Sequence, residues 1–402
     1  MTVWTRLACA GALALALGGC GATTQGTRVA TDAAIPSPQV ALTPENADGL
    51  RQVGARVLFW SQAERDRNFM AMETLFPGHI VKAGGKVRAL PAGEPLPLPA
   101  ADVDAFMAAQ NVTGLIVVQD GRVRLERYAR GFGPDQRWTS FSVAKSFTST
   151  LVGAAIRDGA IKSVDDPVTR YIPELAGSGY DGVTVAQLLT MTSGVRWNEN
   201  YTDPNSDVAR LYAKPAPPGV DPTVAYMRTL VREAEPGSKW VYKTGETNLI
   251  GVLVTRATGR PLANYLSEKV WRPAGMQRDA FWMVDPSGQE ISGCCLSVTL
   301  RDYARMGLFA LEGGAGQVPP DWFKTATAPL ASIGAPGFGY GYQWWTYPGG
   351  RFGAQGIFGQ GIVIDPATRT VIAITSSWPS ATGRELSGQR LAFVAKVLAA
   401  GE

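Results

Sequence analysis

The sequence is poor in the residues on which most hydrolytic active sites depend. Its 402 residues include one histidine, His79, so a Ser-His-Asp triad would have to use it. No G-x-S-x-G segment accompanies it, and His79 is therefore expected to be structural. One histidine and two adjacent cysteines cannot supply a zinc site. A G-x-x-x-x-G-K-[ST] loop is also missing, which argues against a nucleotide enzyme, and we expect no metal or cofactor.

Charge and long apolar runs are scarce as well. The net charge is +4, with no dense run of Lys and Arg, so nucleic acid is not an expected partner. The one long apolar run, at 7–17, follows Arg6 and is shorter than the roughly 20 residues that a membrane-spanning helix needs. It ends in small residues, which is typical of a cleaved export signal.

The export signal stops at "LGGC", residues 17–20, which resembles the bacterial lipobox. That resemblance implies cleavage before Cys20, a lipid on its sulfur and an anchor in the outer membrane on the periplasmic side. The alternative is an ordinary secretory signal in which Cys20 is incidental. We expect a signal peptide at 1–19, a flexible tether at 20–50 and one folded domain at 51–402, touching the membrane only through the lipid.

Only four cysteines are present, and two of them fall in the export signal. The other two, Cys294 and Cys295, are adjacent and do not form a disulfide framework. We expect them to be small buried residues. A vicinal disulfide is the alternative, since the periplasm is oxidising.

Strand patterns lie at both ends of the folded domain, and helical patterns lie between them. The segment 114–131 predicts a hairpin around Asp120-Gly121, and further strands are predicted at 340–347, 351–366 and 370–378. Helices are predicted at 59–76, 139–159, 183–195, 247–259 and 383–400, in a chain that is mostly helical from 165 to 310. The residues at 90–100 predict an extended proline-rich connector. The fold class is α/β (α+β): one antiparallel sheet from both termini, flanked by helices, with an inserted helical lobe.

The stretch "TSFSVAKSFTSTLVGAAIRDG" (139–159) has the apolar spacing of a buried helix and also contains a lysine. Ser142 and Lys145 are three residues apart, so their side chains lie on the same side of that helix. Burial lowers the pKa of a lysine, and the neutral amine can accept the serine proton. The free amides at the helix start favour an oxyanion. The S-x-x-K pattern alone is weak, because about one match is expected by chance in a chain of this length.

The wider context of this motif resembles a known family. "SFSVAKSFTSTLVGAAIRDGAIKSVDDPVTRYIPEL" is similar to the active-site segment of the serine β-lactamase and penicillin-binding-protein superfamily, class C-like. The resemblance continues through "VTVAQLLTMTSGV", "PGSKWVYKTGETNLIGVLVTRATGRPLANYLSEKVWRPAGM" and "FGAQGIFGQGIVIDP". "GIFGQ" and "VRWNENYTDPNSDVARLY" are most similar to the branch of 6-aminohexanoate-dimer hydrolases and carboxylesterases. The resemblance to this superfamily implies a β-lactamase/transpeptidase-like fold.

The resemblance also implies roles for particular residues. Tyr242 falls on the tyrosine of the family's Tyr-x-Asn element and would move protons, held near ionisation by Lys145. Thr244 replaces the asparagine and would contact substrate differently. The backbone N–H groups of Ser142 and Ile357 would form the oxyanion hole, with Gly356 letting the substrate approach the strand.

Other candidates for substrate contact are less specific. In penicillin-recognising relatives a cationic residue stands where this chain has Ala354, so the resemblance implies poor β-lactamase activity. Asp203 and Asp207 either meet a cationic substrate end or serve as solvated turn residues. Trp344, with its neighbouring aromatic residues, either lines the acyl pocket or packs in the core.

These observations together predict a serine hydrolase that cleaves small amides, esters or peptides through an acyl-enzyme. The alternatives are a D,D-peptidase or β-lactamase-type activity, and a catalytically silent lipoprotein that binds a ligand in the envelope. The sequence does not determine the oligomeric state.

Overall fold

The computed structural model describes residues 40–43 and 45–401, which include all but the last residue of the predicted folded domain 51–402. Its main sheet is wholly antiparallel, with the strand order β3-β2-β12-β11-β10-β9-β8-β7. The strands are β2 (Val112–Gln119), β3 (Arg122–Tyr128), β7 (Ala331–Ser332), β8 (Gly339–Tyr340), β9 (Trp345–Thr346), β10 (Phe352–Gln355), β11 (Gly361–Asp365) and β12 (Thr370–Ser376). The pairing of β2 with β12 joins the two ends of the domain, as the sequence predicts.

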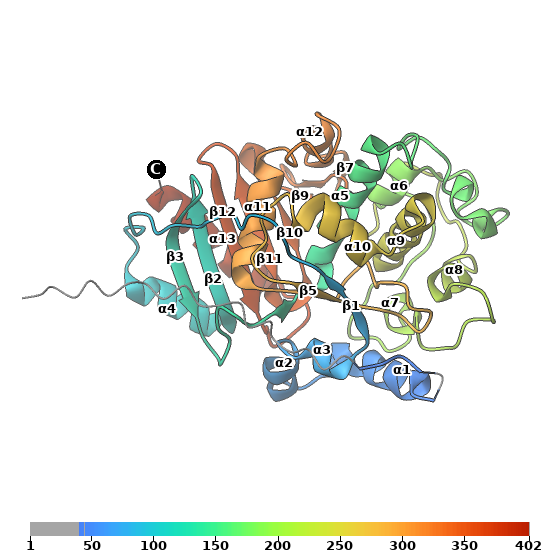
Figure 1. Cartoon of the computed structure of the whole chain (residues 1–402), viewed down its shortest axis with the longest axis horizontal. Helices are drawn as coiled ribbons and strands as arrows, with labels where there is room; N and C mark the ends of the chain where they lie inside the picture. Colours follow the sequence, from blue (N-terminus) through green and yellow to red (C-terminus); the bar gives the residue numbers. More distant parts are fainter. Residues whose placement is uncertain (1–39, 44, 402) are drawn as a thin grey trace, which may run out of the picture. The chain divides into compact units, whose positions relative to one another are not determined.

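Helices cover both faces of this sheet (Figure 1). On one face, α4 (Ala100–Ala109) and α13 (Arg384–Ala400) pack against β2 and β12 through apolar residues such as Phe106, Ile372 and Phe393. On the other face lies α11 (Leu300–Leu311), where Gly307 leaves room for Val371. The sheet is therefore buried on both sides, which explains the apolar runs in its central strands.

The inserted helical lobe is built around two long buried helices, α5 (Ala144–Arg157) and α9 (Thr244–Thr258), which pack on each other. Both helices end as predicted, at the positive-φ residues Gly159 and Gly259. The shorter helices are α6 (Val185–Leu189), α7 (Asp207–Arg210), α8 (Pro222–Met227), α10 (Leu262–Leu266) and α12 (Trp322–Ala326).

A second, four-stranded sheet was not predicted. It has the order β1-β5-β6-β4 and consists of β1 (Gly78–Val81), β4 (Trp138–Thr139), β5 (Ala280–Met283) and β6 (Leu296–Val298). These strands have two to four residues each, which is too short for an alternating pattern to stand out. Two of them interrupt the segment 165–310 that the sequence analysis describes as mostly helical.

The N-terminal helices also differ from the prediction. The expected helix 59–76 begins only at Gln62, where Ser61 and Glu64 form a capping box, and it is split into α2 (Gln62–Asn68) and α3 (Met72–Leu75) at Ala71, whose φ of −132° and ψ of 20° are not helical. A further helix, α1 (Ala47–Arg56), begins inside the segment expected to be a tether. The residues at 90–100 are extended as far as Pro99, with α4 starting at Ala100.

The predicted helix 183–195 is a single short turn, α6. Thr184 and Gln187 cap its start, and it ends at Leu189 rather than at Gly194. Gly194 instead allows a close contact, because a Cβ there would lie 2.0 Å from the carbonyl oxygen of Ala234. Its positive φ therefore serves tertiary packing rather than a helix end.

Candidate active site

Ser142 lies in a tight turn between the small sheet and α5. The turn Phe141–Val143 is a 3₁₀ helix that precedes α5, so Ser142 stands just before the α-helix that was predicted to contain it. Ser140 anchors the turn to β6, donating its N–H to the carbonyl of Leu296 at 2.8 Å and accepting from Leu296 N–H at 3.1 Å. Two antiparallel strands and a buried helix thus fix the serine, which is 8% exposed.

Lys145 is buried in the first turn of α5, as its place in the sequence predicts. Its Nζ donates to Thr244 Oγ1 at 3.0 Å and to the carbonyl of Gly293 at 2.7 Å. Burial lowers the pKa of Lys145 to about 7, although the charge of Glu199 acts in the opposite direction. A large fraction of the amine is therefore neutral near pH 7 and able to accept a proton.

Tyr242 stands beside both of these residues. Lys145 Nζ lies 5.2 Å from the centre of its ring, and Tyr242 and Ser142 line the same cavity, where the serine hydroxyl acts to lower the pKa of the phenol. The expectation that Lys145 holds this phenol near ionisation is wrong. Burial, followed by the negative charge of Glu199, raises the pKa of Tyr242 above its usual value, with Ser142 a smaller opposing effect. The phenol therefore stays protonated at neutral pH.

The sequence analysis missed Glu199, which contacts Thr244, the residue that accepts a hydrogen bond from Lys145. Its carboxylate accepts from Tyr201 OH at 2.8 Å and from the backbone N–H of Thr244 at 2.9 Å. It also accepts from Trp197 Nε1 and from the Thr244 hydroxyl. Glu199 and Lys145 are thereby linked through one hydroxyl. Glu199 is one of several acidic residues in its loop, so only the tertiary structure distinguishes it.

Thr244, which replaces the family's asparagine, occupies the first residue of α9. Its hydroxyl accepts from Lys145 and donates to Glu199, so it serves the internal network. It is 8% exposed and lines a cavity beside Ser142.

Gly356 and Ile357 follow directly after β10. A Cβ at Gly356 would lie 2.5 Å from the carbonyl oxygen of Ser140, so a glycine is needed for the strand to approach the serine turn. The close approach seen here is to the protein's own backbone. Gly356 also lines a cavity beside Ser142, so the expectation that it lets substrate approach the strand stays a prediction. The approach of the strand brings Ile357 next to Ser142, and both residues line the same two cavities.

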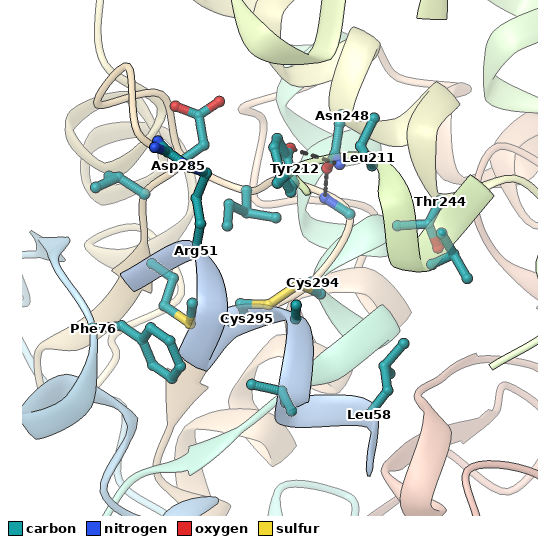
Figure 2. A pocket seen from close by; sticks show the side chains of 18 of the residues that line it. Arg51, Leu58, Phe76, Leu211, Tyr212, Thr244, Asn248, Asp285, Cys294 and Cys295 are labelled. Atoms are coloured by element: carbon teal, nitrogen blue, oxygen red, sulfur yellow. Dashed lines mark hydrogen bonds between the residues drawn. A yellow bond between two sulfur atoms is a disulfide. The ribbon is translucent and has the colours of Figure 1, made fainter. Parts of the chain in front are cut away.

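The first of these cavities, here called the apolar cavity, has a volume of about 180 Å³. Figure 2 shows it between α1 and the loops that carry Tyr212, Asp285 and Cys294. Its lining includes Leu50, Gly54, Leu58, Phe76, Leu211 and Met283.

The second, here called the polar cavity, has a volume of about 430 Å³. Besides Ser142 and Ile357, its lining includes Glu199, Tyr242, Trp345, Gln355, Trp378 and Arg390. The two cavities meet at the serine and at Ile357, so a substrate bound across Ser142 would have one side in each.

Arg390 gives the polar cavity a positive charge that the sequence analysis did not foresee. The residue is buried on α13, donates to Gln355 Oε1 at 2.6 Å and to the carbonyl of Gln360 at 3.3 Å, and lies over the ring of Trp378. Among the described residues it forms no ion pair with a carboxylate, and burial lowers its pKa. The cavity therefore has a cation from a different element than the one that contains Ala354, and the expectation of poor β-lactamase activity stays a prediction.

Three of the predicted substrate contacts are not supported by the structure. Asp207 accepts from Asn198 N–H and from Tyr226 OH, both at 2.7 Å, and Asp203 accepts from Asn205 N–H at 2.8 Å. The Asp203 bond is a local turn bond, the Asp207 bonds join separate parts of the lobe, and neither aspartate lines either cavity. Trp344 is wholly buried against Phe323 and Phe352, whereas its neighbour Trp345 faces the polar cavity.

The remaining candidates from the sequence lie away from Ser142 or outside the described residues. His79 Nδ1 contacts Glu290 Oε1 at 2.9 Å, a bond that raises the histidine pKa against the effect of burial. Cys294 and Cys295 form a vicinal disulfide, the alternative left open above. Cys20 and the signal peptide lie outside the described residues. Within the part of the chain that the structure describes, no cluster of His, Cys, Asp and Glu could hold a metal ion, and no helix is long and apolar enough to cross a membrane.

Comparisons with known proteins agree with this arrangement. The Beta-lactamase family model matches residues 100–396. A 6-aminohexanoate-dimer hydrolase from Paenarthrobacter ureafaciens is 33% identical over 312 residues, which cover 71% of this chain and 78% of that enzyme.

Solved structures show the same fold. A Bacillus anthracis protein provisionally named a 6-aminohexanoate-dimer hydrolase superposes with a TM-score of 0.71 at 23% identity, over 83% of this chain and 93% of that one. A family VIII carboxylesterase superposes with a TM-score of 0.58 at 18% identity, over 76% of this chain and 99% of that one.

Proposed function

This chain belongs to the beta-lactamase family and is a serine hydrolase, and from that premise we propose that it cleaves small amides or esters through an acyl-enzyme on Ser142. The observation that carries the proposal is the placement of Lys145: a buried amine with a pKa of about 7, three residues after Ser142 and beside the ring of Tyr242, which lines the same cavity as the serine. A buried lysine without a catalytic use costs stability, so its retention here supports catalysis.

In the proposed first step, Ser142 Oγ bonds to the substrate carbonyl carbon while its proton passes to the neutral amine of Lys145. The backbone N–H groups of Ser142 and Ile357 hold the oxyanion. As the intermediate collapses, the bond to the leaving group breaks and the protonated Tyr242 gives that group its proton. The Lys145 ammonium then reprotonates the phenolate. Water repeats the sequence on the acyl ester, releasing the acid and restoring Ser142.

The polar cavity supports a leaving group that carries a carboxylate. Tyr242 lines that cavity and not the apolar one, so the group that takes its proton belongs on this side. A buried charge in a protein is normally paired, and Arg390 lacks a carboxylate partner among the described residues. An amide or ester whose leaving amine or alcohol ends in a carboxylate would supply that partner. The name of the Paenarthrobacter relative, a 6-aminohexanoate-dimer hydrolase, supports such a substrate.

A D,D-peptidase or β-lactamase-type activity is the second candidate, and Arg390 favours it too, because those substrates also carry a carboxylate near the reacting amide. A silent ligand-binding protein is disfavoured, since binding alone gives no reason to keep Lys145 neutral and buried.

Labelling with a fluorophosphonate tests the nucleophile. We expect the wild type to form a covalent adduct and to hydrolyse p-nitrophenyl esters, and the Ser142→Ala variant to do neither. Adduct formation in Ser142→Ala would show that another residue is the nucleophile. A wild type that stays unlabelled, under conditions in which a related hydrolase reacts, would support the silent binder.

A further inference from the structure

Helix α1 covers the apolar cavity without filling it. Leu50 and Gly54 of α1, and Val57 and Leu58 of the 3₁₀ turn that follows it, have the spacing of one helix face, and all four line that cavity. They are only partly buried, and α1 contains no fully buried residue. An apolar helix face normally packs against other side chains, so a void beneath it forfeits contacts. Because this cavity costs packing contacts and lies beside the nucleophile, we interpret it as a binding site for part of a ligand.

The rest of the cavity lining is also mainly apolar. Figure 2 shows Leu58, Phe76 and Leu211 around the space, with the Cys294–Cys295 disulfide forming part of its wall. Of the polar groups nearby, Asn248 Nδ2 donates to Tyr212 OH at 3.0 Å, whereas Asp285 Oδ2 is buried without a hydrogen-bond partner among the described residues. The charged residues Arg51 and Asp285 lie on the opposite side of the view from Thr244, at the end remote from the serine network.

We propose that the apolar cavity is the acyl site, and that the substrate is an ester or amide of an unbranched aliphatic acid whose chain lies beneath α1. This inference rests on the proposed function and adds the chemistry of the acid. The cavity contains Ser142 and Ile357 but not Tyr242, so it can receive the group that stays on the serine and not the group that leaves. The two sides of the substrate then differ: an apolar acyl chain on one, a polar leaving group on the other.

Gly54 offers a way to shorten the cavity without touching the catalytic groups. A Cβ at this position would lie 3.9 Å from Phe76, an ordinary contact, so a longer side chain would extend into the open space. Leucine also favours a helix more than glycine does, so Gly54→Leu is not expected to unfold α1. Gly49→Leu is the matched control: it lies on the same helix, is exposed, has nothing within 4 Å of its Cβ and does not line the cavity.

The measurement is kcat/KM for p-nitrophenyl esters from acetate to decanoate. For the wild type we expect kcat/KM to rise about fourfold per added methylene until the cavity is full, the factor that burying one CH₂ provides. In Gly54→Leu the ratio of octanoate to acetate cleavage should fall about tenfold, and the optimum should move to a shorter chain. Gly49→Leu should keep the wild-type ratio.

A wild-type profile that is flat with chain length, or one that Gly54→Leu leaves unchanged, would overturn the acyl site while the hydrolase itself stands. Equal shifts in both glycine variants would show that α1 acts through its stability, and would also overturn the acyl site. If the wild type cleaves none of the esters and takes up no fluorophosphonate, the proposed function fails, and the acyl site fails with it.

Discussion

At the scale of single residues, the chemistry of the site depends on how the surrounding protein shifts the pKa values of Lys145 and Tyr242. The pKa of Lys145 is lowered to about 7 because the amine is removed from water, with a hydroxyl and a carbonyl as its hydrogen-bond acceptors. Tyr242 is kept protonated by burial and by a carboxylate close by. The amine therefore suits the role of base, and the phenol suits that of acid.

Replacing the lysine should separate activity from stability. Lys145→Met should abolish hydrolysis but raise the free energy of unfolding by about 1–3 kcal/mol at pH 7, because the wild type must bury or neutralise an amine. The pKa of the Lys145 amine is 10.5 in the unfolded chain and about 7 in the folded protein. Between those pH values the unfolded chain binds the extra proton, so the free energy of unfolding of the wild type rises with pH. The advantage of Lys145→Met should therefore be larger at pH 6 than at pH 9 in urea unfolding. Lys162→Met, at an exposed lysine, should change stability by less than about 0.5 kcal/mol at either pH.

The Glu199 carboxylate should set the pH at which the enzyme becomes active. Its negative charge raises the pKa of Lys145, so Glu199→Gln should lower that pKa and move the acid limb of the kcat/KM profile below about pH 7. Asp203→Asn, in the same loop but outside both cavities, should leave the limb in place. A shift in the Asp203 variant as well, or none in the Glu199 variant, would contradict this assignment.

At the scale of elements, the site is assembled where four of them converge. The serine turn is tied to β6, the lysine points from α5 toward the start of α9, and the end of β10 closes on the backbone of Ser140. The loop after Ile291 completes the group, since the carbonyl of Gly293 accepts from Lys145 and its N–H donates to Asn248 at 2.6 Å.

The vicinal disulfide is expected to hold that loop in place. It follows Gly293 directly, and Cys295 has a φ of +70°, a conformation that residues other than glycine seldom adopt. Reduction with dithiothreitol should release this constraint and displace the Gly293 carbonyl. We expect kcat/KM to fall by roughly three- to tenfold, because small misplacements of groups around a catalytic residue lower the rate. The pH limb assigned to Lys145 should shift as well.

The double variant Cys294→Ser/Cys295→Ser controls for other effects of the reductant. It should have the lowered activity from the start and not respond to dithiothreitol. If the reductant lowers its activity as much as that of the wild type, the disulfide does not position the lysine. Mass spectrometry of the intact protein verifies that the bond has been reduced.

At the scale of the whole molecule, the fold requires both ends of the domain to be present. Strand β2 pairs with β12, and α4 packs with α13 across the same face, so the helical lobe is an insertion between two halves of one sheet. Arg390 reaches the polar cavity from the last helix, so residues near both ends of the domain contribute to one site.

The location of the protein in the cell is also a prediction at this scale. If Cys20 carries a lipid, the wild type expressed in a bacterial host should sediment with the membranes, and Cys20→Ser should move it to the soluble periplasmic fraction with its esterase activity intact. Metabolic labelling with a radioactive fatty acid should mark the wild type alone. A wild type that is soluble and unlabelled would favour the ordinary secretory signal.

Much of this protein could be predicted from the sequence, because the relevant signals are local. The Asp120-Gly121 hairpin, the helix ends at Gly159 and Gly259 and the strand predicted at 370–378 depend on neighbouring residues, and the structure confirms them. The strands predicted at 340–347 and 351–366 are each broken into two, β8 and β9 in the first and β10 and β11 in the second. The placement of Ser142 and Lys145 three residues apart is local too, and the lysine is buried as its helix predicts.

Only the tertiary structure decided what surrounds those two residues. Glu199, Arg390 and the disulfide reach the site from segments far apart in the sequence, and no local pattern marks them. The protonation of Tyr242 and the division into an apolar and a polar cavity depend on burial and on distances across the fold. Periodicity and turn chemistry act between neighbours in the chain, whereas desolvation and charge act between neighbours in space.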